Sequence, residues 1–107
     1  MKSVLVISAM GLLLPSGAAF ADDDFYKTKN CFACHRIDRT TLGPSFRNIA
    51  AKYVEDKGAH VELAKKIREG GVGVWGQVPM PAQPQVTEAE ALTLARWIQR
   101  KGASSCR

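Results

Sequence analysis

Apolar residues recur at helical spacing in three segments of the chain, residues 46–53, 59–69 and 87–101. Positions three or four apart lie on one face of an α-helix, so the pattern predicts three amphipathic helices that share a core. The residues expected to face that core are Phe46, Ile49, Ala50 and Tyr53, then Val61, Ala64 and Ile67, and finally Ala91, Leu94, Ala95, Trp97 and Ile98.

Short polar residues and glycines mark the ends of these helices. Ser45 is placed to cap the first helix, and Thr87 with Glu90 forms the Ser/Thr-x-x-Glu capping box that starts the third. The glycine pair at 70–71 is predicted to end the second helix, and Gly102 to end the third.

Two other stretches have a different character. Residues 25–30 follow three aspartates, which favour a helix start, and predict a short first helix with Phe25 or Tyr26 turned inward. Residues 70–86 are rich in Gly and Pro and almost uncharged, which predicts a long apolar loop rather than a helix. A loop of this kind in a small domain is usually functional or packs against something large.

The N-terminal residues have the pattern of a secretory signal peptide. Lys2 supplies the positive start, residues 4–14 form an apolar run too short for a membrane span, and small residues at 19 and 21 make a cleavage site. We expect residues 1–21 to be removed, leaving one exported, soluble domain over residues 22–107 in the periplasm. Within it, residues 102–107 are expected to form a frayed tail.

The charge of the chain is modestly positive. Lys2 is the only charged residue in the signal segment, so its removal lowers the formal net charge from +5 to +4. The positive charge is spread along the chain without a basic stripe, which argues for acidic partner surfaces and against nucleic acid. A domain this small buries only about 60% of its unfolded surface, so a buried cofactor would add stability that the core needs.

Residues 31–35 read Cys-x-x-Cys-His, the attachment signature of c-type haem. Cys31 and Cys34 are spaced so that each thiol can add to one vinyl group of a single porphyrin, while His35 reaches the iron from the same side. A dithiol redox centre would need an alternating strand and helix pattern, which is not visible here. A structural zinc site needs about four Cys or His ligands, but outside the motif the chain offers only His60 and Cys106.

A second axial ligand is expected in the apolar loop. Met80 stands between Pro79 and Pro81, whose rings restrict the backbone and can present the thioether at a fixed place. A lone methionine is normally a core residue, but this rigid setting beside a haem motif favours a ligand. Pro44, or a neighbour, could accept a hydrogen bond from the other ring nitrogen of His35, or the Gly-Pro sequence there could be a simple turn.

Together these residues resemble the class I c-type cytochromes, and among them the small bacterial cytochrome c-551 group. The similarity covers nearly all of the mature chain. Its specific parts are the Cys-x-x-Cys-His motif, Leu42-Gly43-Pro44, Gly73-Val74-Trp75-Gly76, Pro79-Met80-Pro81 and the last helix with Trp97. The resemblance implies an all-α fold of about four helices around one covalently attached haem, with Phe25 or Tyr26 packed against Leu94 and Trp97.

The resemblance also implies a set of residues around the haem. These are Cys31 and Cys34 for covalent attachment of one haem c, His35 and Met80 as axial ligands, the Pro44 carbonyl as acceptor for His35, and Trp75 as hydrogen-bond donor to a buried propionate. Members of the group often place a cation of the third helix near a propionate, and both Lys66 and Arg68 stand close to that position. Where members often have an asparagine that touches the methionine sulfur, this chain has Gln83 and Gln85.

The expected function is one-electron transfer between larger redox proteins, with no catalytic residue. Its partners would be a donor and an acceptor that dock weakly at an exposed haem edge, and the protein would act as a monomer unless Cys106 forms a disulfide between chains. The rival function is a haem enzyme or gas-binding protein with an open or labile sixth iron position. A third is a module of a larger complex, which co-purification of a stable partner would reveal.

Overall fold

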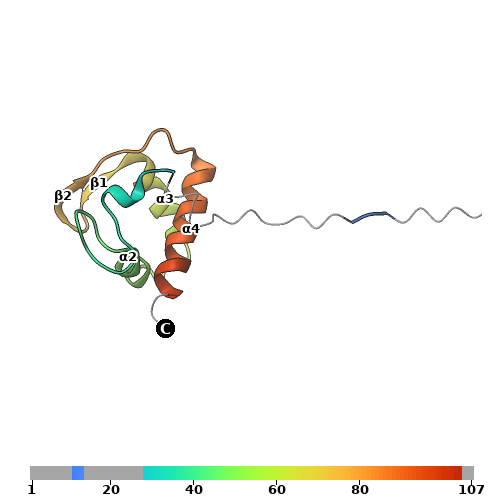
Figure 1. The fold of residues 1–107 in the computed structure, drawn as a ribbon, viewed down its shortest axis with the longest axis horizontal. Coiled ribbons are helices and arrows are strands. Elements are labelled where there is room, and N and C mark those ends of the chain that lie inside the picture. The colour runs from blue at the N-terminus through green and yellow to red at the C-terminus, as the bar shows by residue number, and fades with distance from the viewer. Residues whose placement is uncertain (1–10, 14–27, 105–107) are drawn as a thin grey trace, which may run out of the picture.

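The computed structural model describes residues 11–13 and 28–104. In chain order its elements are the 3-10 helix η1 (Cys31–Ala33), α2 (Phe46–Lys52), α3 (Ala59–Glu69), β1 (Gly71–Gly73), β2 (Gly76–Met80) and α4 (Glu88–Ser104). Figure 1 shows α4 along one side of the molecule and the β1–β2 hairpin on the other. The fold of the described part is thus mostly helical, as predicted, with one small sheet.

The predicted helix starts are confirmed. The Ser45 side chain accepts a hydrogen bond from Asn48 N at 3.0 Å at the start of α2. Thr87 Oγ1 accepts one from Glu90 N at 3.2 Å at the start of α4. The left-handed φ of 72° at Gly70 ends α3, as expected of a glycine after a helix.

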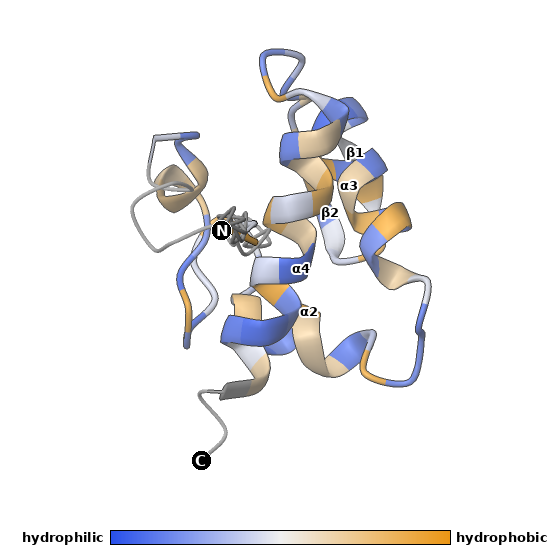
Figure 2. Ribbon diagram, turned by 90° about the vertical axis from the view of Figure 1, so that its right-hand side faces the viewer, coloured by the Kyte–Doolittle hydropathy of each residue, from blue (hydrophilic) through white to orange (hydrophobic). Residues whose placement is uncertain are grey.

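The core lies where α4 packs against both α2 and α3. Trp97, Phe46 and Leu94 are its largest fully buried side chains, and the rings of Phe46 and Trp97 meet edge to face with centroids 5.5 Å apart. Figure 2, which looks onto α4, shows hydrophilic and hydrophobic residues alternating along this helix. All the core positions predicted for the first and third helices are buried.

One core position predicted for α3 is wrong. Val61 is 58% exposed, whereas Ala59, Leu63, Ala64 and Ile67 are buried. Residues spaced strictly three apart drift around a helix by about 60° at each step, so a run of them leaves the buried face. The buried positions follow the true 3.6-residue period instead.

The predicted end of the last helix is also wrong. α4 continues through Gly102 to Ser104. A Cβ at Gly102 would collide with Phe46 O and lie 2.6 Å from the Ala50 Cβ, so this glycine lets α2 and α4 approach closely. Its role is contact with another helix rather than helix termination.

The stretch expected to be a long loop contains an antiparallel hairpin. Gly71 pairs with Met80 and Gly73 with Gly76, with an irregularity in the register between the two pairs. The two turn glycines have φ of 104° and 110°, which side chains rarely adopt. The hairpin places Trp75 at its tip and Met80 at its end.

Several predictions fall outside the described residues. They are the signal segment apart from residues 11–13, the first part of the predicted first helix with Phe25 and Tyr26, and Cys106 in the tail. Residues 28–30, the last part of that predicted helix, form a turn that leads into η1.

Candidate functional site

A single turn of 3-10 helix arranges the Cys-x-x-Cys-His residues. Cys31 O accepts hydrogen bonds from Cys34 N at 3.2 Å and from His35 N at 3.0 Å, so the chain reverses tightly. Asn30, just before η1, has a φ of 64°, a left-handed conformation that Asn tolerates better than most residues. As a result, both half-buried thiols and the imidazole line one cavity.

The imidazole of His35 is held on three sides. Its Nδ1 lies 2.7 Å from the Pro44 carbonyl oxygen, and its ring stacks on Phe46 with centroids 5.3 Å apart. A Cβ at Gly43 would lie 2.6 Å from Cε1 and 2.9 Å from Nδ1, so the glycine backbone closes the third side. A carbonyl oxygen only accepts hydrogen bonds, so Nδ1 carries the proton and Nε2 keeps the lone pair that can bind a metal.

The loop that carries Pro44 to this position is tied back to the motif. The Cys34 carbonyl oxygen accepts hydrogen bonds from Thr41 Oγ1 at 2.7 Å and from Gly43 N at 2.8 Å. These two bonds place Gly43 and Pro44 against the imidazole, and α2 begins directly after them at Phe46.

Met80 is presented by the end of β2. Its side chain is half-buried and packs against the core. A Cβ at Gly70 would collide with Met80 O, so the glycine lets the end of α3 approach this strand. Just beyond, Gln83 N donates to the carbonyl oxygens of Ile67 and Arg68 at 3.1 and 3.2 Å. The chain from Met80 to Gln83 thus lies against the end of α3 and is hydrogen-bonded to it.

These groups line a cavity of about 280 Å³. The residues with potential to hold a cofactor there are Cys31, Cys34, His35 and Met80. The inner wall is made of core side chains, including Phe46, Ile49, Leu63, Ile67, Leu94, Trp97 and Ile98. The outer wall holds large apolar residues that are exposed, namely Leu42, Val72, Val74, Trp75 and Val78.

The donors and walls of this cavity fit covalently bound haem. Burial raises the pKa of the Cys31 thiol, whereas a dithiol redox centre depends on a lowered thiol pKa. Among the described residues, no three His, Cys, Asp or Glu side chains form a group that could hold a metal ion, as a structural zinc site would require. Two thiols, an imidazole and a thioether in an apolar wall suit haem attachment and ligation.

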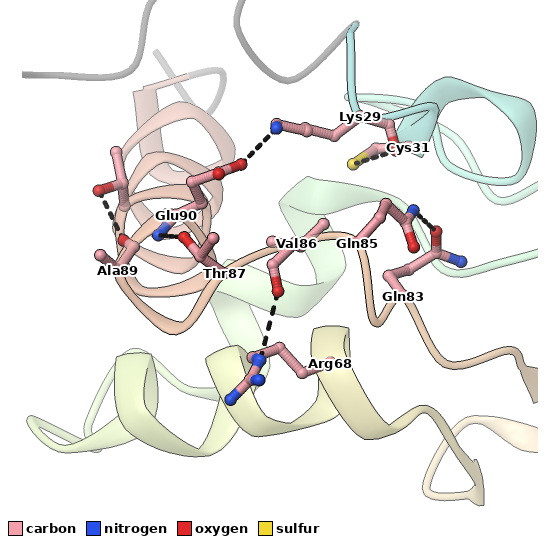
Figure 3. Close-up of polar contacts among 10 residues, drawn as sticks. Lys29, Cys31, Arg68, Gln83, Gln85, Val86, Thr87, Ala89 and Glu90 are labelled. Atoms are coloured by element: carbon pink, nitrogen blue, oxygen red, sulfur yellow. Dashed lines mark hydrogen bonds and ion pairs between the residues drawn. The ribbon is translucent and has the colours of Figure 1, made fainter.

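Two cations lie against residues of the cavity wall, Lys52 at Trp75 and Lys66 at Gly71. Lys52 Nζ, from the last turn of α2, lies 5.6 Å from the centroid of the Trp75 ring. Lys66 lines the cavity, and its Nζ lies 3.4 Å from where a Cβ on Gly71 would be. Arg68 instead donates from Nε to Val86 O at 3.3 Å (Figure 3). Of the two cations that the sequence left open, Lys66 is the one at the cavity.

The two glutamines after Met80 bond to each other. Gln85 Nε2 donates to Gln83 Oε1 at 2.6 Å, as Figure 3 shows, and Gln83 Nε2 lies 3.4 Å from Pro81 O. Gln83 lines the cavity. The sequence placed both residues near the methionine, and the structure puts Gln83 at the wall.

An ion pair joins Lys29, two residues before the motif, to the start of α4. Lys29 Nζ contacts Glu90 Oε2 (Figure 3). The hydrogen bond from Lys29 lowers the pKa of the Glu90 carboxyl. At the capping box Thr87 Oγ1 accepts from Glu90 N, while the Glu90 carboxylate pairs with Lys29.

Sequence reasoning missed two contacts and one backbone conformation at this site. It did not find the close packing of Gly43 on the imidazole, the Lys52 contact with Trp75, or the left-handed Asn30. Gly43 had a weak signal, since a glycine just before a proline marks a tight turn. The contact between Lys52 and Trp75 joins elements distant in sequence and had none.

Comparisons with known proteins agree with this geometry. The family model for cytochrome c matches residues 23–101. Cytochrome c-552 of Nitrosomonas europaea is 47% identical over 90 residues, covering 84% of this chain and 87% of that protein. Cytochrome c-551 of Pseudomonas aeruginosa is 43% identical over 97 residues, covering 90% of this chain and 92% of that protein. The crystal structure of wild-type Nitrosomonas europaea cytochrome c552 matches with a TM-score of 0.71 at 46% identity, covering 74% of this chain and 98% of that one.

The mostly helical fold and the thiol, imidazole and thioether groups define a small haem protein of the c type. The chain belongs to the cytochrome c family, as a small class I c-type cytochrome. Its cofactor is covalently bound haem c, and its role is in electron transport. None of the helices in the described part of the chain is long and apolar enough to span a membrane.

Proposed function

We propose that the protein is a periplasmic electron carrier that passes single electrons between larger redox proteins. One haem c is attached through Cys31 and Cys34, with His35 and Met80 as the axial ligands. The observation that carries this proposal is that the His35 imidazole and the Met80 side chain line the same cavity as the two thiols.

His35, Pro44 and Met80 each have a defined part in this site. When bound, haem c supplies one iron that alternates between the ferric and ferrous states. His35 offers Nε2 to the iron because its Nδ1–H donates a hydrogen bond to the Pro44 carbonyl oxygen. Met80 offers its sulfur from a segment fixed on α3 by Gly70 and Gln83. Two rigidly held ligands leave little rearrangement between oxidation states and no open position for substrate.

The polar groups of Trp75 and Lys66 at the cavity wall suit the propionates of the cofactor. Trp75 has an indole N–H that can donate, and it stands among the residues that line the cavity. Lys66 supplies a cation at the same wall, and Lys52 lies over the indole ring. We assign Trp75 and Lys66 to propionate contacts.

Redox partners are expected to dock at the exposed apolar residues of the outer cavity wall. Leu42, Val72 and Val78 are each at least 60% exposed and line the cavity. Such a patch suits the small interfaces of transient electron-transfer complexes. The net positive charge favours acidic partner surfaces and predicts association that weakens as salt is added.

The ligand set is tested on the haem-loaded protein. The ferric near-infrared spectrum is recorded for a methionine-to-iron charge-transfer band, and carbon monoxide is added to the reduced form. We expect the band in the parent protein, its loss in Met80→Ala, and carbon monoxide uptake only in that variant. Val78→Ala is the matched control, because it shortens another side chain of β2 that lines the cavity.

The opposite result would change the functional conclusion. A parent protein without the band that binds carbon monoxide readily would have an open iron position. The protein would then be a haem enzyme or a gas-binding protein rather than an electron carrier.

A further inference from the structure

Arg36 directly follows the proposed histidine ligand, and its side chain turns back onto the motif. Its Nη1 donates to the carbonyl oxygen of His35 at 3.0 Å and also to that of Phe32. The residue is half-buried rather than fully exposed. The guanidinium is thus held against the backbone that carries the imidazole.

Of the two carbonyls bound by Arg36, that of Phe32 belongs to η1 and that of His35 lies two residues beyond its end. The last carbonyls of a helix have no partner within it and carry partial negative charge. Neighbouring carbonyls of the motif have other donors, since Cys31 O accepts from two backbone N–H groups and Cys34 O from Thr41 and Gly43. Arg36 therefore supplies a cationic cap for this turn, with charge-assisted hydrogen bonds.

The backbone at Arg36 is also fixed. Its carbonyl oxygen accepts a hydrogen bond from Phe46 N at 2.9 Å, and Ile37 O accepts one from Arg47 N at 3.0 Å. Phe46 is the ring on which His35 stacks. One hydrogen-bonded unit thus contains the imidazole, the start of α2 and the guanidinium.

We infer that Arg36 is a positioning residue whose fixed charge favours the reduced state of the protein. This inference rests on the proposed electron-carrier function. Arginine stays protonated at all accessible pH values, so its charge does not change during turnover. With His35 as an iron ligand, reduction would add one electron at the group whose backbone carbonyl Arg36 binds. A positive charge held there would stabilise the reduced form more than the oxidised form. Because the side chain is half-buried, salt should screen it less than an exposed cation.

The test compares reduction equilibria of haem-loaded variants against a redox mediator, at low and high salt. In Arg36→Gln we expect the equilibrium constant for reduction to fall about threefold, as for one partly screened unit charge at short range, and the fall to persist at high salt. Arg36→Lys keeps the charge and should stay closer to the parent. Arg39→Gln removes an equal charge from an exposed residue three positions further on and should change the constant less, with the change lost at high salt.

The near-infrared band distinguishes failure of the proposed ligand set from failure of the proposed role of Arg36. If the parent lacks the band, the proposed ligand set and function are wrong. If all variants keep the band but Arg36→Gln behaves like Arg39→Gln, only the role of Arg36 is overturned. An equal loss in Arg36→Gln and Arg36→Lys would also overturn it, because charge would then not be the cause.

Discussion

At the scale of single residues, the site depends on how the backbone closes around one imidazole. Gly43 is the tightest of these contacts, because its backbone lies against the ring whose Nδ1 bonds Pro44 O. Gly43→Ala would place a methyl group 2.6 Å from Cε1, so the ring has to shift from its partner. We expect a loss of about 1–3 kcal/mol of unfolding free energy, typical of overpacking. Denaturant unfolding of the haem-loaded variant measures it.

A second glycine provides the control for Gly43. At Gly58 the nearest atom to an added Cβ is Asp56 Oδ1 at 3.5 Å, which is an ordinary contact. Gly58→Ala should leave the stability and the near-infrared band close to those of the parent. If Gly43→Ala were equally harmless, the imidazole would not be held by this backbone contact.

The sequence identified the candidate ligands, but not the residues that hold them in place. The motif and the flanking prolines of Met80 are local features, and both candidate ligands lie at one cavity. Lys52 and Arg36 carried no such signal, because their roles arise from folding back onto Trp75 and onto the motif carbonyls. A local sequence pattern can identify reactive groups. Contacts between segments that are distant in sequence, or of a side chain that folds back on its own segment, can be found only from the structure.

At the scale of elements, the crossing of α2 and α4 depends on Gly102. Alanine is normally about 1 kcal/mol better than glycine inside a helix. Here the opposite is expected, because a Cβ would collide with Phe46 O and press on Ala50. Gly102→Ala should lower the free energy of unfolding by about 1–3 kcal/mol through overpacking.

Ala103 tests the helix contribution separately. It is exposed on the next position of α4, so Ala103→Gly should cost only the intrinsic propensity difference of about 1 kcal/mol. Thermal or denaturant unfolding of both variants gives the comparison. A stabilised Gly102→Ala protein would mean that the helices can separate at no cost.

Two of the errors in the sequence-based elements arise from contacts between helices, and the third arises from a weak strand pattern. Gly102 has the local signal of a helix end, but its neighbour on α2 decides its role. Val61 fits a three-residue spacing, but the contact with α4 selects a different stripe of α3. The hairpin at 71–80 was missed because its strands are short, exposed and rich in glycine, without the alternation that marks a strand. The helix starts were predicted correctly because capping is local.

At the scale of the whole molecule, the two cysteines of the motif link folding to the cofactor. The cavity wall includes large core residues such as Phe46, Leu94 and Trp97, which also hold α2 and α4 together. A domain of this size buries little apolar surface of its own, so contacts with an attached haem contribute a large share of its free energy of unfolding. Stability should therefore depend on attachment more than on any single helix contact.

The double variant Cys31→Ser/Cys34→Ser tests this dependence, because it removes both attachment points and changes little else. We expect it to lose cooperative unfolding and most near-ultraviolet circular dichroism, since the core side chains that line the cavity would lose their contacts with haem. Cys106→Ser is the matched control, as it removes the same chemical group from outside the motif, and it should unfold like the parent. A double variant that kept the parent's cooperative transition would show that the helices form a complete core by themselves. The haem would then contribute little to the stability of the fold, and the exposed apolar residues of the hairpin would serve only to contact partners.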